Sequence, residues 1–232
     1  MADDPMPQDL VEYSRATFAP EDEALVALTH ATLDFGMPVG WEITSDVGRL
    51  FQVLCRAIGA RRVLEFGTLA GHSALWFARA LPMDGRVLSI EINADYAAFA
   101  RAQLNKAGVG DRVEVRVGAG IELLPELEQT VKQTHEPFDV IFLDADKAHY
   151  PEFLEWSVRV LRPGGILLAD NVLRAGSWNG QTLLDPASDD PRILAIRRFN
   201  RLLAEHPQFT SLIIPMRAGV AVGLFKGASV KS

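Results

Sequence analysis

The stretch that decides the fold is LEFGTLAGHS, Leu64–Ser73. A short apolar run ends at Phe66, glycines follow at Gly67 and Gly71, and helical periodicity begins directly afterwards. Glycine allows a tight turn and a close approach of a ligand to the backbone, and the first amides of the helix can hold an anion. The spacing Glu-x-Gly-x-x-x-Gly differs from the dinucleotide fingerprint Gly-x-Gly-x-x-Gly. The stretch therefore predicts a strand, a turn and a helix, with a ligand at the turn; a glycine turn without a ligand is the alternative.

From this stretch onward, short apolar runs alternate with helical segments, which is typical of a parallel sheet with crossover helices. The expected strands are Arg62–Phe66, Arg86–Ile90, Val113–Val117, Phe138–Leu143, Gly165–Ala169, Phe209–Pro215 and Gly219–Phe225. The expected helices are Ala24–Phe35, Asp46–Ile58, Gly71–Ala80, Ala94–Ala107, Gly120–Gln129, Tyr150–Leu161 and Pro191–Glu205. Only Met216–Ala218 joins the last two strands, so these must be antiparallel. We expect one domain over residues 1–232, with an N-terminal helical cap (1–60) and a sheet core (61–232).

Composition limits the function classes. Hydrophobic residues make up 48% of the 232 residues, and 30 acidic against 23 basic side chains give a net charge of −7. This balance argues against nucleic-acid binding through a broad basic face. Cys55 is the only cysteine, which excludes an internal disulfide and a cysteine metal cage. The acidic N-terminus lacks the apolar run of a signal peptide, and no stretch is long enough to span a membrane, so we expect a cytoplasmic protein.

Three further strand ends carry polar residues. Glu91 ends the second strand about 20 residues after the glycine turn, where an acid can accept hydrogen bonds from a ribose diol. Asp144 ends the fourth strand in FLDADK, and Asp170 and Asn171 end the fifth in LLADN. Ligands of open parallel sheets bind beyond the carboxyl ends of the strands, and three oxygen ligands suit a hard cation such as magnesium, manganese or calcium. The alternative for these three residues is that each caps the following helix or turn.

Together, the motifs LEFGTLAGHSAL, SIEIN, FLDADK and LLADN resemble the cation-dependent class I O-methyltransferases, the family of the catechol and caffeoyl-CoA O-methyltransferases. The resemblance covers the chain from about Trp41 to Phe225. It implies an α/β, Rossmann-like fold with a mostly parallel seven-stranded sheet, an antiparallel last strand, helices on both faces and extra N-terminal helices. It also implies S-adenosylmethionine (SAM) and a divalent cation as cofactors, a hydroxylated aromatic small molecule as methyl acceptor, and a homodimer.

The resemblance also implies roles for individual residues. The expected cofactor-binding residues are Ile43, Glu65, Gly67, Thr68, Ser73, Glu91, Gly120 and Asp144. The expected catalytic residues are Lys147 and Asp144, and the expected metal ligands are Asp144, Asp170 and Asn171. Lys147 matches the lysine base of the catechol enzymes, and its position three residues after Asp144 places it where a dication would disfavour its cationic form. One departure stands out in MRAGVAVG, where the catechol enzymes have a carboxylate before the final strand and this chain has Arg217 and no acid.

The expected reaction is metal-assisted methyl transfer to a vicinal diol, with Lys147 taking the proton. Three alternatives remain open. Some bacterial members of the family methylate a modified tRNA uridine, a NAD-dependent oxidoreductase would share the glycine turn and Glu91, and a non-catalytic module could bind SAM alone. His72 and His149 are expected to be loop or capping histidines. The irregular segment Leu173–Asp190 is a candidate lid, and its Trp178 could stack on an aromatic acceptor.

Overall fold

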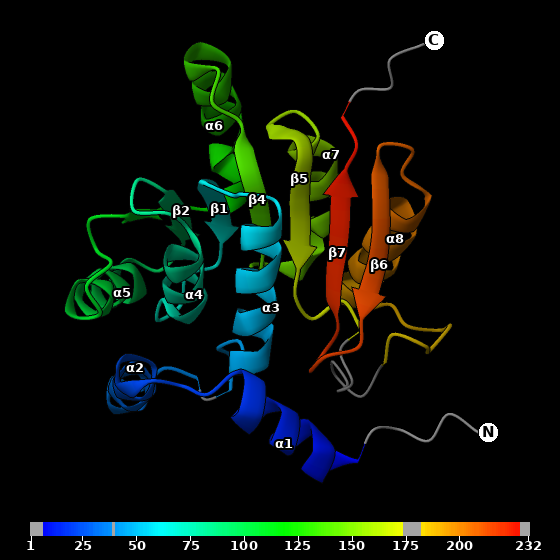
Figure 1. Cartoon of the computed structure of the whole chain (residues 1–232). Helices are drawn as coiled ribbons and strands as arrows, with labels where there is room; N and C mark the ends of the chain where they lie inside the picture. Colours follow the sequence, from blue (N-terminus) through cyan, green and yellow to red (C-terminus); the bar gives the residue numbers. More distant parts are fainter. Residues whose placement is uncertain (1–6, 39, 174–181, 228–232) are drawn as a thin grey trace.

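The computed structural model describes residues 7–38, 40–173 and 182–227. Its centre is a seven-stranded sheet with the strand order β3-β2-β1-β4-β5-β7-β6 (Figure 1). The strands are β1 (Arg62–Phe66), β2 (Arg86–Glu91), β3 (Val113–Val117), β4 (Phe138–Leu143), β5 (Leu161–Ala169), β6 (Phe209–Ile214) and β7 (Val220–Phe225). Strands β1 to β5 pair in parallel, and β7 runs antiparallel to both β5 and β6. The predicted mixed sheet with an antiparallel last strand is confirmed.

Helices cover both faces of the sheet because side chains alternate along each buried strand. The helices are α1 (Gln8–Phe18), α2 (Glu23–Asp34), α3 (Ser45–Ala57), α4 (His72–Ala80), α5 (Ala94–Lys106), α6 (Gly120–Thr134), α7 (Tyr150–Ser157) and α8 (Pro191–Glu205), with a 3₁₀ turn η1 (Lys147–His149). In β4, Val140 and Phe142 join the apolar cluster of α3, α4 and α5. Ile141 and Leu143 join the cluster of α6, α7 and α8.

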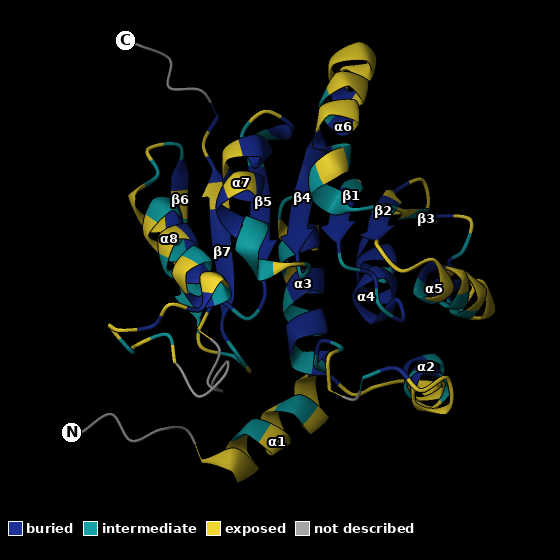
Figure 2. Cartoon of the chain, turned by 180° about the vertical axis from the view of Figure 1, so that it is seen from behind, coloured by how far each residue is buried: buried dark blue, intermediate teal, exposed yellow. Residues whose placement is uncertain are grey.

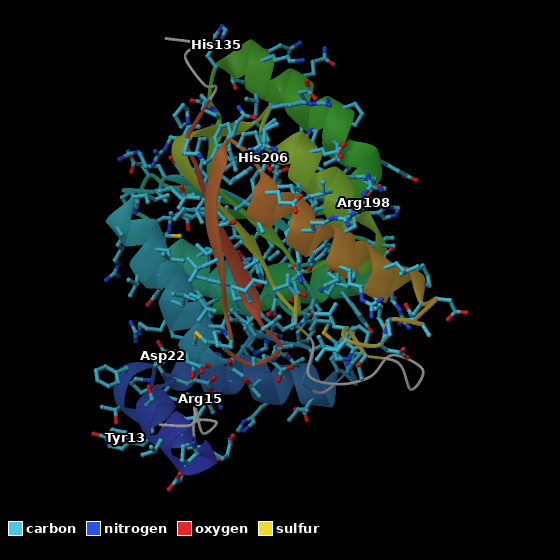
Figure 3. The ribbon with its side chains drawn as sticks, turned by 90° about the vertical axis from the view of Figure 1, so that its right-hand side faces the viewer. Tyr13, Arg15, Asp22, His135, Arg198 and His206 are labelled. Atoms are coloured by element: carbon cyan, nitrogen blue, oxygen red, sulfur yellow. The ribbon has the colours of Figure 1, made fainter. Side chains whose placement is uncertain are left out.

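The N-terminal segment lies beyond the carboxyl ends of the parallel strands, at the lower end of the view in Figure 1. Helix α1 has no buried residue, and Figure 2 shows it coloured as exposed or intermediate along its length. An ion pair of 3.2 Å joins Arg15 of α1 to Asp46 of α3, and one of 2.9 Å joins Asp22, the N-cap of α2, to Arg79 of α4; Figure 3 labels Arg15 and Asp22. Helix α3 instead belongs to the core, because its Phe51 is fully buried and stacks on Phe77 at 5.0 Å.

Several predicted boundaries were wrong. Strand β5 begins at Leu161, four residues before the predicted Gly165, because Leu161 already pairs with Phe138 of β4. Helix α7 accordingly ends at Ser157 and not at Leu161. Helix α6 continues past the predicted end at Gln129, because Val131 in its last turns is still buried against the sheet.

Helix α1 was not among the helices whose bounds were predicted, and it buries none of its residues. Within the described residues, no helix is long and apolar enough to cross a membrane. Residues 174–181 of the candidate lid, including Trp178, lie outside the described residues.

Candidate active site

A small open pocket lies at the carboxyl ends of β1 and β4. It is lined by Trp41, Glu42, Ile43, Gly67, Thr68, Leu69, His72, Ser73 and Asp144. Gly67 has a φ of +99°, and a side chain there would collide with the backbone carbonyl of Asp144. Glycine is therefore required for the turn after β1 to approach the end of β4. The pocket thus brings together five of the predicted cofactor-binding residues: Ile43, Gly67, Thr68, Ser73 and Asp144.

Glu91, at the end of β2, is 7% exposed and is held by three backbone amides. Its Oε2 accepts hydrogen bonds from the amides of Thr68 at 3.1 Å and Leu69 at 2.9 Å, and its Oε1 accepts one from Asn93 at 2.9 Å. These bonds join the end of β2 to the turn after β1. Backbone amides therefore orient the carboxylate of Glu91, and no cationic side chain takes part in these contacts.

Glu65, in β1, is completely buried, and its two oxygens differ. Oε2 accepts a short hydrogen bond from Ser89 Oγ, the register partner in β2, while Oε1 has no hydrogen-bond partner. Burial raises the pKa of Glu65 to about 8, and the nearby charges of Asp144 and Glu91 raise it further, against hydrogen bonds from Ser73 and Ser89. A buried, unpartnered carboxyl oxygen is costly unless a ligand satisfies it. Glu65 is consequently prepared for a cationic or hydrogen-donating ligand.

The predicted residues Thr68 and Gly120 have more indirect positions. The hydroxyl of Thr68 is buried and lies 2.6 Å from Ser89 Oγ, so it belongs to the chain of hydroxyls that leads to Glu65. Gly120 is the first residue of α6 and packs against Phe66, outside the residues that line the pocket. The end of β3 lies close by, because the amide of Gly118 donates to the carbonyl of Glu91 at 2.9 Å.

The three predicted metal ligands lie at adjacent strand ends. Leu143 and Ala169 are register partners in β4 and β5, so the next residues, Asp144 and Asp170, leave the sheet side by side. The amide of Asp170 donates to the carbonyl of Leu143 at 3.0 Å, and Asn171 Nδ2 donates to Asp170 Oδ2 at 3.1 Å. Asp170 is fully buried, and its Oδ1 has no partner. The structure thus brings Asp144, Asp170 and Asn171 together, as predicted from the sequence.

Each of the two aspartates also has a cationic partner. Lys147 Nζ donates to Asp144 Oδ1 at 2.7 Å and lies 2.9 Å from the hydroxyl of Tyr150. Arg217 Nη1 donates to Asp170 Oδ2 at 3.1 Å. Burial, followed by the charge of Asp144, raises the pKa of Asp170 to about 6, while Arg217 opposes the rise.

The donor set fits a hard divalent cation. Within the described residues, no group of three or more His, Cys, Asp and Glu side chains could hold a metal, and Asn171 is outside those residue types. The cluster supplies two carboxylates and an amide oxygen, which are the donors that magnesium and calcium prefer. The unpartnered and buried Oδ1 of Asp170 is the atom that most needs a positively charged ligand.

A family model described as O-methyltransferase matches residues 15–225. The chain is 39% identical over 196 residues to a catechol O-methyltransferase of Niastella koreensis, with 84% of this chain and 85% of the relative covered. The chain belongs to the O-methyltransferase family. This O-methyltransferase is also 37% identical over 207 residues to a catechol O-methyltransferase of Mycobacterium tuberculosis, with 89% and 88% covered. The predicted enzyme class, a SAM-dependent O-methyltransferase, is thereby confirmed. These relatives give no support to the NAD-dependent alternative.

Solved structures agree with this family. The O-methyltransferase TomG from Streptomyces achromogenes, in complex with SAM, matches with a TM-score of 0.84 and 34% identity, covering 94% of this chain and 96% of that one. An O-methyltransferase from Bacillus cereus in complex with S-adenosylhomocysteine (SAH) matches with a TM-score of 0.83 and 33% identity, covering 94% and 97%. The predicted Rossmann-like class I methyltransferase fold is confirmed by these matches and by the strand order.

Sequence reasoning missed two residues of the site. Tyr150, fully buried at the start of α7, places its hydroxyl 2.8 Å from the carbonyl of Leu143 and 3.1 Å from that of Asp170. It thereby joins the two aspartate-bearing strand ends, a role that its position after FLDADK could have suggested. His72 was expected to be a loop or capping residue, but it begins α4 and lines the pocket, with Nε2 3.2 Å from Thr29 Oγ1 of α2. Burial lowers its pKa.

Proposed function

We propose that this O-methyltransferase methylates one hydroxyl of a vicinal diol on an aromatic small molecule, with a divalent cation held by Asp144, Asp170 and Asn171. The observation that carries the proposal is the buried and unpartnered Oδ1 of Asp170 beside two further oxygen ligands. A bound cation would lower the pKa of an acceptor hydroxyl and hold two adjacent oxygens of the same acceptor. An acceptor with a single hydroxyl would lack the second contact.

Lys147 is assigned as the general base that takes the proton of the acceptor hydroxyl. Its Nζ lies 2.7 Å from Asp144 Oδ1, one of the proposed ligand atoms, so an acceptor oxygen on the cation would lie near it. A general base must lie within hydrogen-bond reach of the proton that it takes. The reaction forms an oxygen–methyl bond, breaks the sulfur–methyl bond of SAM and yields a methyl ether and SAH. Asp144 and Tyr150 orient the lysine through their contacts with Nζ.

The cofactor is assigned to the pocket between the turn after β1 and the start of α3. Glu65, Gly67, Thr68 and Ser73 would surround the methionine part, Glu91 would accept hydrogen bonds from the ribose, and Ile43 and Gly120 would contact the remainder. This assignment is supported by the residues that line the pocket and by the oriented carboxylate of Glu91 at its edge. SAM carries a sulfonium and an ammonium group, and both are favoured near carboxylates.

The experiment that tests the proposal is turnover of catechol with labelled SAM, with and without EDTA, followed by rescue with magnesium or manganese. Chelation should abolish turnover, because the cation contributes several kcal/mol to the transition state. Binding of SAM should survive, because the proposed cofactor residues act without the metal. Full activity in EDTA would show that Asp144, Asp170 and Asn171 have only a structural role. Phenol serves as the mono-hydroxy control and should be methylated far more slowly than catechol.

A homodimer is also proposed, with α1 contributing to the interface. Leu10, Tyr13 and Phe18 on this helix are 50%, 65% and 68% exposed, which is unusual for large apolar side chains that gather on one helix; Tyr13 is labelled in Figure 3. Light scattering at micromolar concentration should give twice the mass of the chain, and a monomeric mass would refute the dimer. The cytoplasmic location, and the absence of a nucleic-acid or membrane partner, remain predictions from composition.

A further inference from the structure

Arg217 is a charged residue of the site that the proposed reaction does not use. It lies in the turn between β6 and β7 and has a left-handed φ of 51°. Its Nη1 donates to Asp170 Oδ2 at 3.1 Å, and its Nη2 donates a short hydrogen bond to the carbonyl of Gly40 in the N-terminal segment. The side chain is only 20% exposed. A charged side chain that is largely buried needs an oppositely charged or hydrogen-bonding partner.

The charges of the cluster balance before anything binds. Asp144 is paired with Lys147, and Asp170 with Arg217. A divalent cation adds two positive charges, and Lys147 must lose its own proton before it can take that of the acceptor, which removes one of them. A single positive charge then remains at the site. A second anionic group on the acceptor would neutralise it.

The same cation weakens the contact between Arg217 and Asp170. A dication on Asp170 supplies the charge that the guanidinium supplied, and like charges a few ångströms apart repel each other in a buried site. The guanidinium then needs another acceptor. Its planar set of donors matches a carboxylate with two parallel hydrogen bonds.

We propose that Arg217 selects acceptors that carry a carboxylate in addition to the vicinal hydroxyls. Before the cation and the acceptor bind, the guanidinium of Arg217 lies in contact with Asp170. This inference rests on the proposed function, because it requires both a cation at Asp170 and a diol acceptor. It makes a dihydroxybenzoate a better acceptor than the neutral catechols.

The test compares kcat/KM for 3,4-dihydroxybenzoate with that for 3,4-dihydroxybenzyl alcohol, a neutral acceptor of nearly the same shape. The native enzyme should prefer the acid by roughly tenfold or more, as expected for a charge-assisted pair of hydrogen bonds. Arg217→Gln should reduce this preference to about one, mainly through KM for the acid. Arg217→Lys keeps the charge and should restore much of the preference. Arg198→Gln is the matched control, because Arg198 lies on α8 with its side chain 55% exposed, 3.9 Å from Glu155 (Figure 3), and its ratio should equal that of the native enzyme.

A second readout does not depend on activity. Manganese affinity, measured by water-proton relaxation without cofactor or acceptor, should rise roughly tenfold in Arg217→Gln, since a competing cation near Asp170 has been removed. It should not change in Arg198→Gln. Manganese affinity that is unchanged or weaker in Arg217→Gln, or equal rates for the acid and the alcohol in the native enzyme, would overturn the role of Arg217 and leave the proposed function intact. If the native enzyme methylates neither diol, the proposed function fails and the inference fails with it.

Discussion

The two halves of the site hold their buried acids in different ways. Beside β1 and β2, Glu65 and Glu91 receive hydrogen bonds from hydroxyls and backbone amides. Beside β4 and β5, Asp144 and Asp170 are each paired with a cationic side chain. In the first half, these contacts include no cationic side chain, so a cationic cofactor can meet the acids directly. In the second half, a cation must compete with a side chain that already neutralises the acid.

This comparison predicts that the largest effect on turnover comes from the second half. Asp170→Ala should lower kcat by roughly a thousandfold, because the several kcal/mol that a cation supplies would be lost. Calorimetry should give a SAM affinity within about threefold of the native value, because the cofactor half does not use Asp170. Asp84→Ala, which breaks an exposed ion pair with Arg61, is the control and should change neither quantity. If Asp170→Ala keeps native turnover, the half of the site beside β4 and β5 has no catalytic role.

Lys147→Ala should have the next largest effect. Loss of a general base typically lowers kcat by about a hundredfold or more, while manganese should still bind, since Lys147 is no ligand. The rate lost should be partly recovered at high pH, where the acceptor hydroxyl ionises without a base. A variant that loses manganese binding together with activity would instead identify Lys147 as a structural partner of Asp144.

Glu91→Ala should act on binding more than on rate. The ribose would lose its acceptor, and the amides of Thr68, Leu69 and Asn93 would lose theirs, so SAM affinity should fall by about 1–3 kcal/mol. Adenosine, which has the ribose without the methionine part, should lose affinity by a similar factor when tested as a competitor. An unchanged affinity for both compounds would remove Glu91 from the cofactor site.

The sequence was sufficient for the sheet and for the placement of the polar residues at its strand ends, because both depend on strong local patterns. Buried strands such as Phe138–Leu143 are continuous apolar runs, and their ends are marked by polar residues such as Asp144 and Asp170. Adjacent parallel strands then bring those ends together without any further information. Helix α1, which buries none of its residues, was not predicted.

The charge pairing of the site could not be predicted in the same way. The ion pair between Arg217 and Asp170 joins residues 47 positions apart, and its geometry depends on the turn between β6 and β7. The sequence showed only that Arg217 stands where an acid was expected. The link from Thr68 through Ser89 to Glu65 likewise depends on the register of β1 and β2.

The last prediction has the smallest effect and concerns the proton that Glu65 carries in the free enzyme. With a pKa raised to about 8 by burial, Glu65 is protonated in the free enzyme at pH 7. Its contribution to stability is therefore fully present below its ordinary pKa of 4.5 and is lost as the pH rises through about 8. Glu65→Gln should flatten this loss, which thermal unfolding between pH 5 and pH 9 would measure.

Binding of SAM should reverse the preference of Glu65 for its protonated form. A cationic group of the cofactor near the unpartnered Oε1 favours the carboxylate and lowers the pKa, so binding at pH 7 should release about one proton. At pH 9, where Glu65 is already ionised, the release should nearly vanish. Calorimetry in buffers of different ionisation enthalpy measures the number, and Glu65→Gln is the control that should release none. SAH lacks the sulfonium charge but keeps the ammonium, so equal release with SAM and SAH would assign the contact to the ammonium. Release that persists in Glu65→Gln would mean that another group loses the proton. The neutral form of Glu65 would then play no part in binding the cofactor.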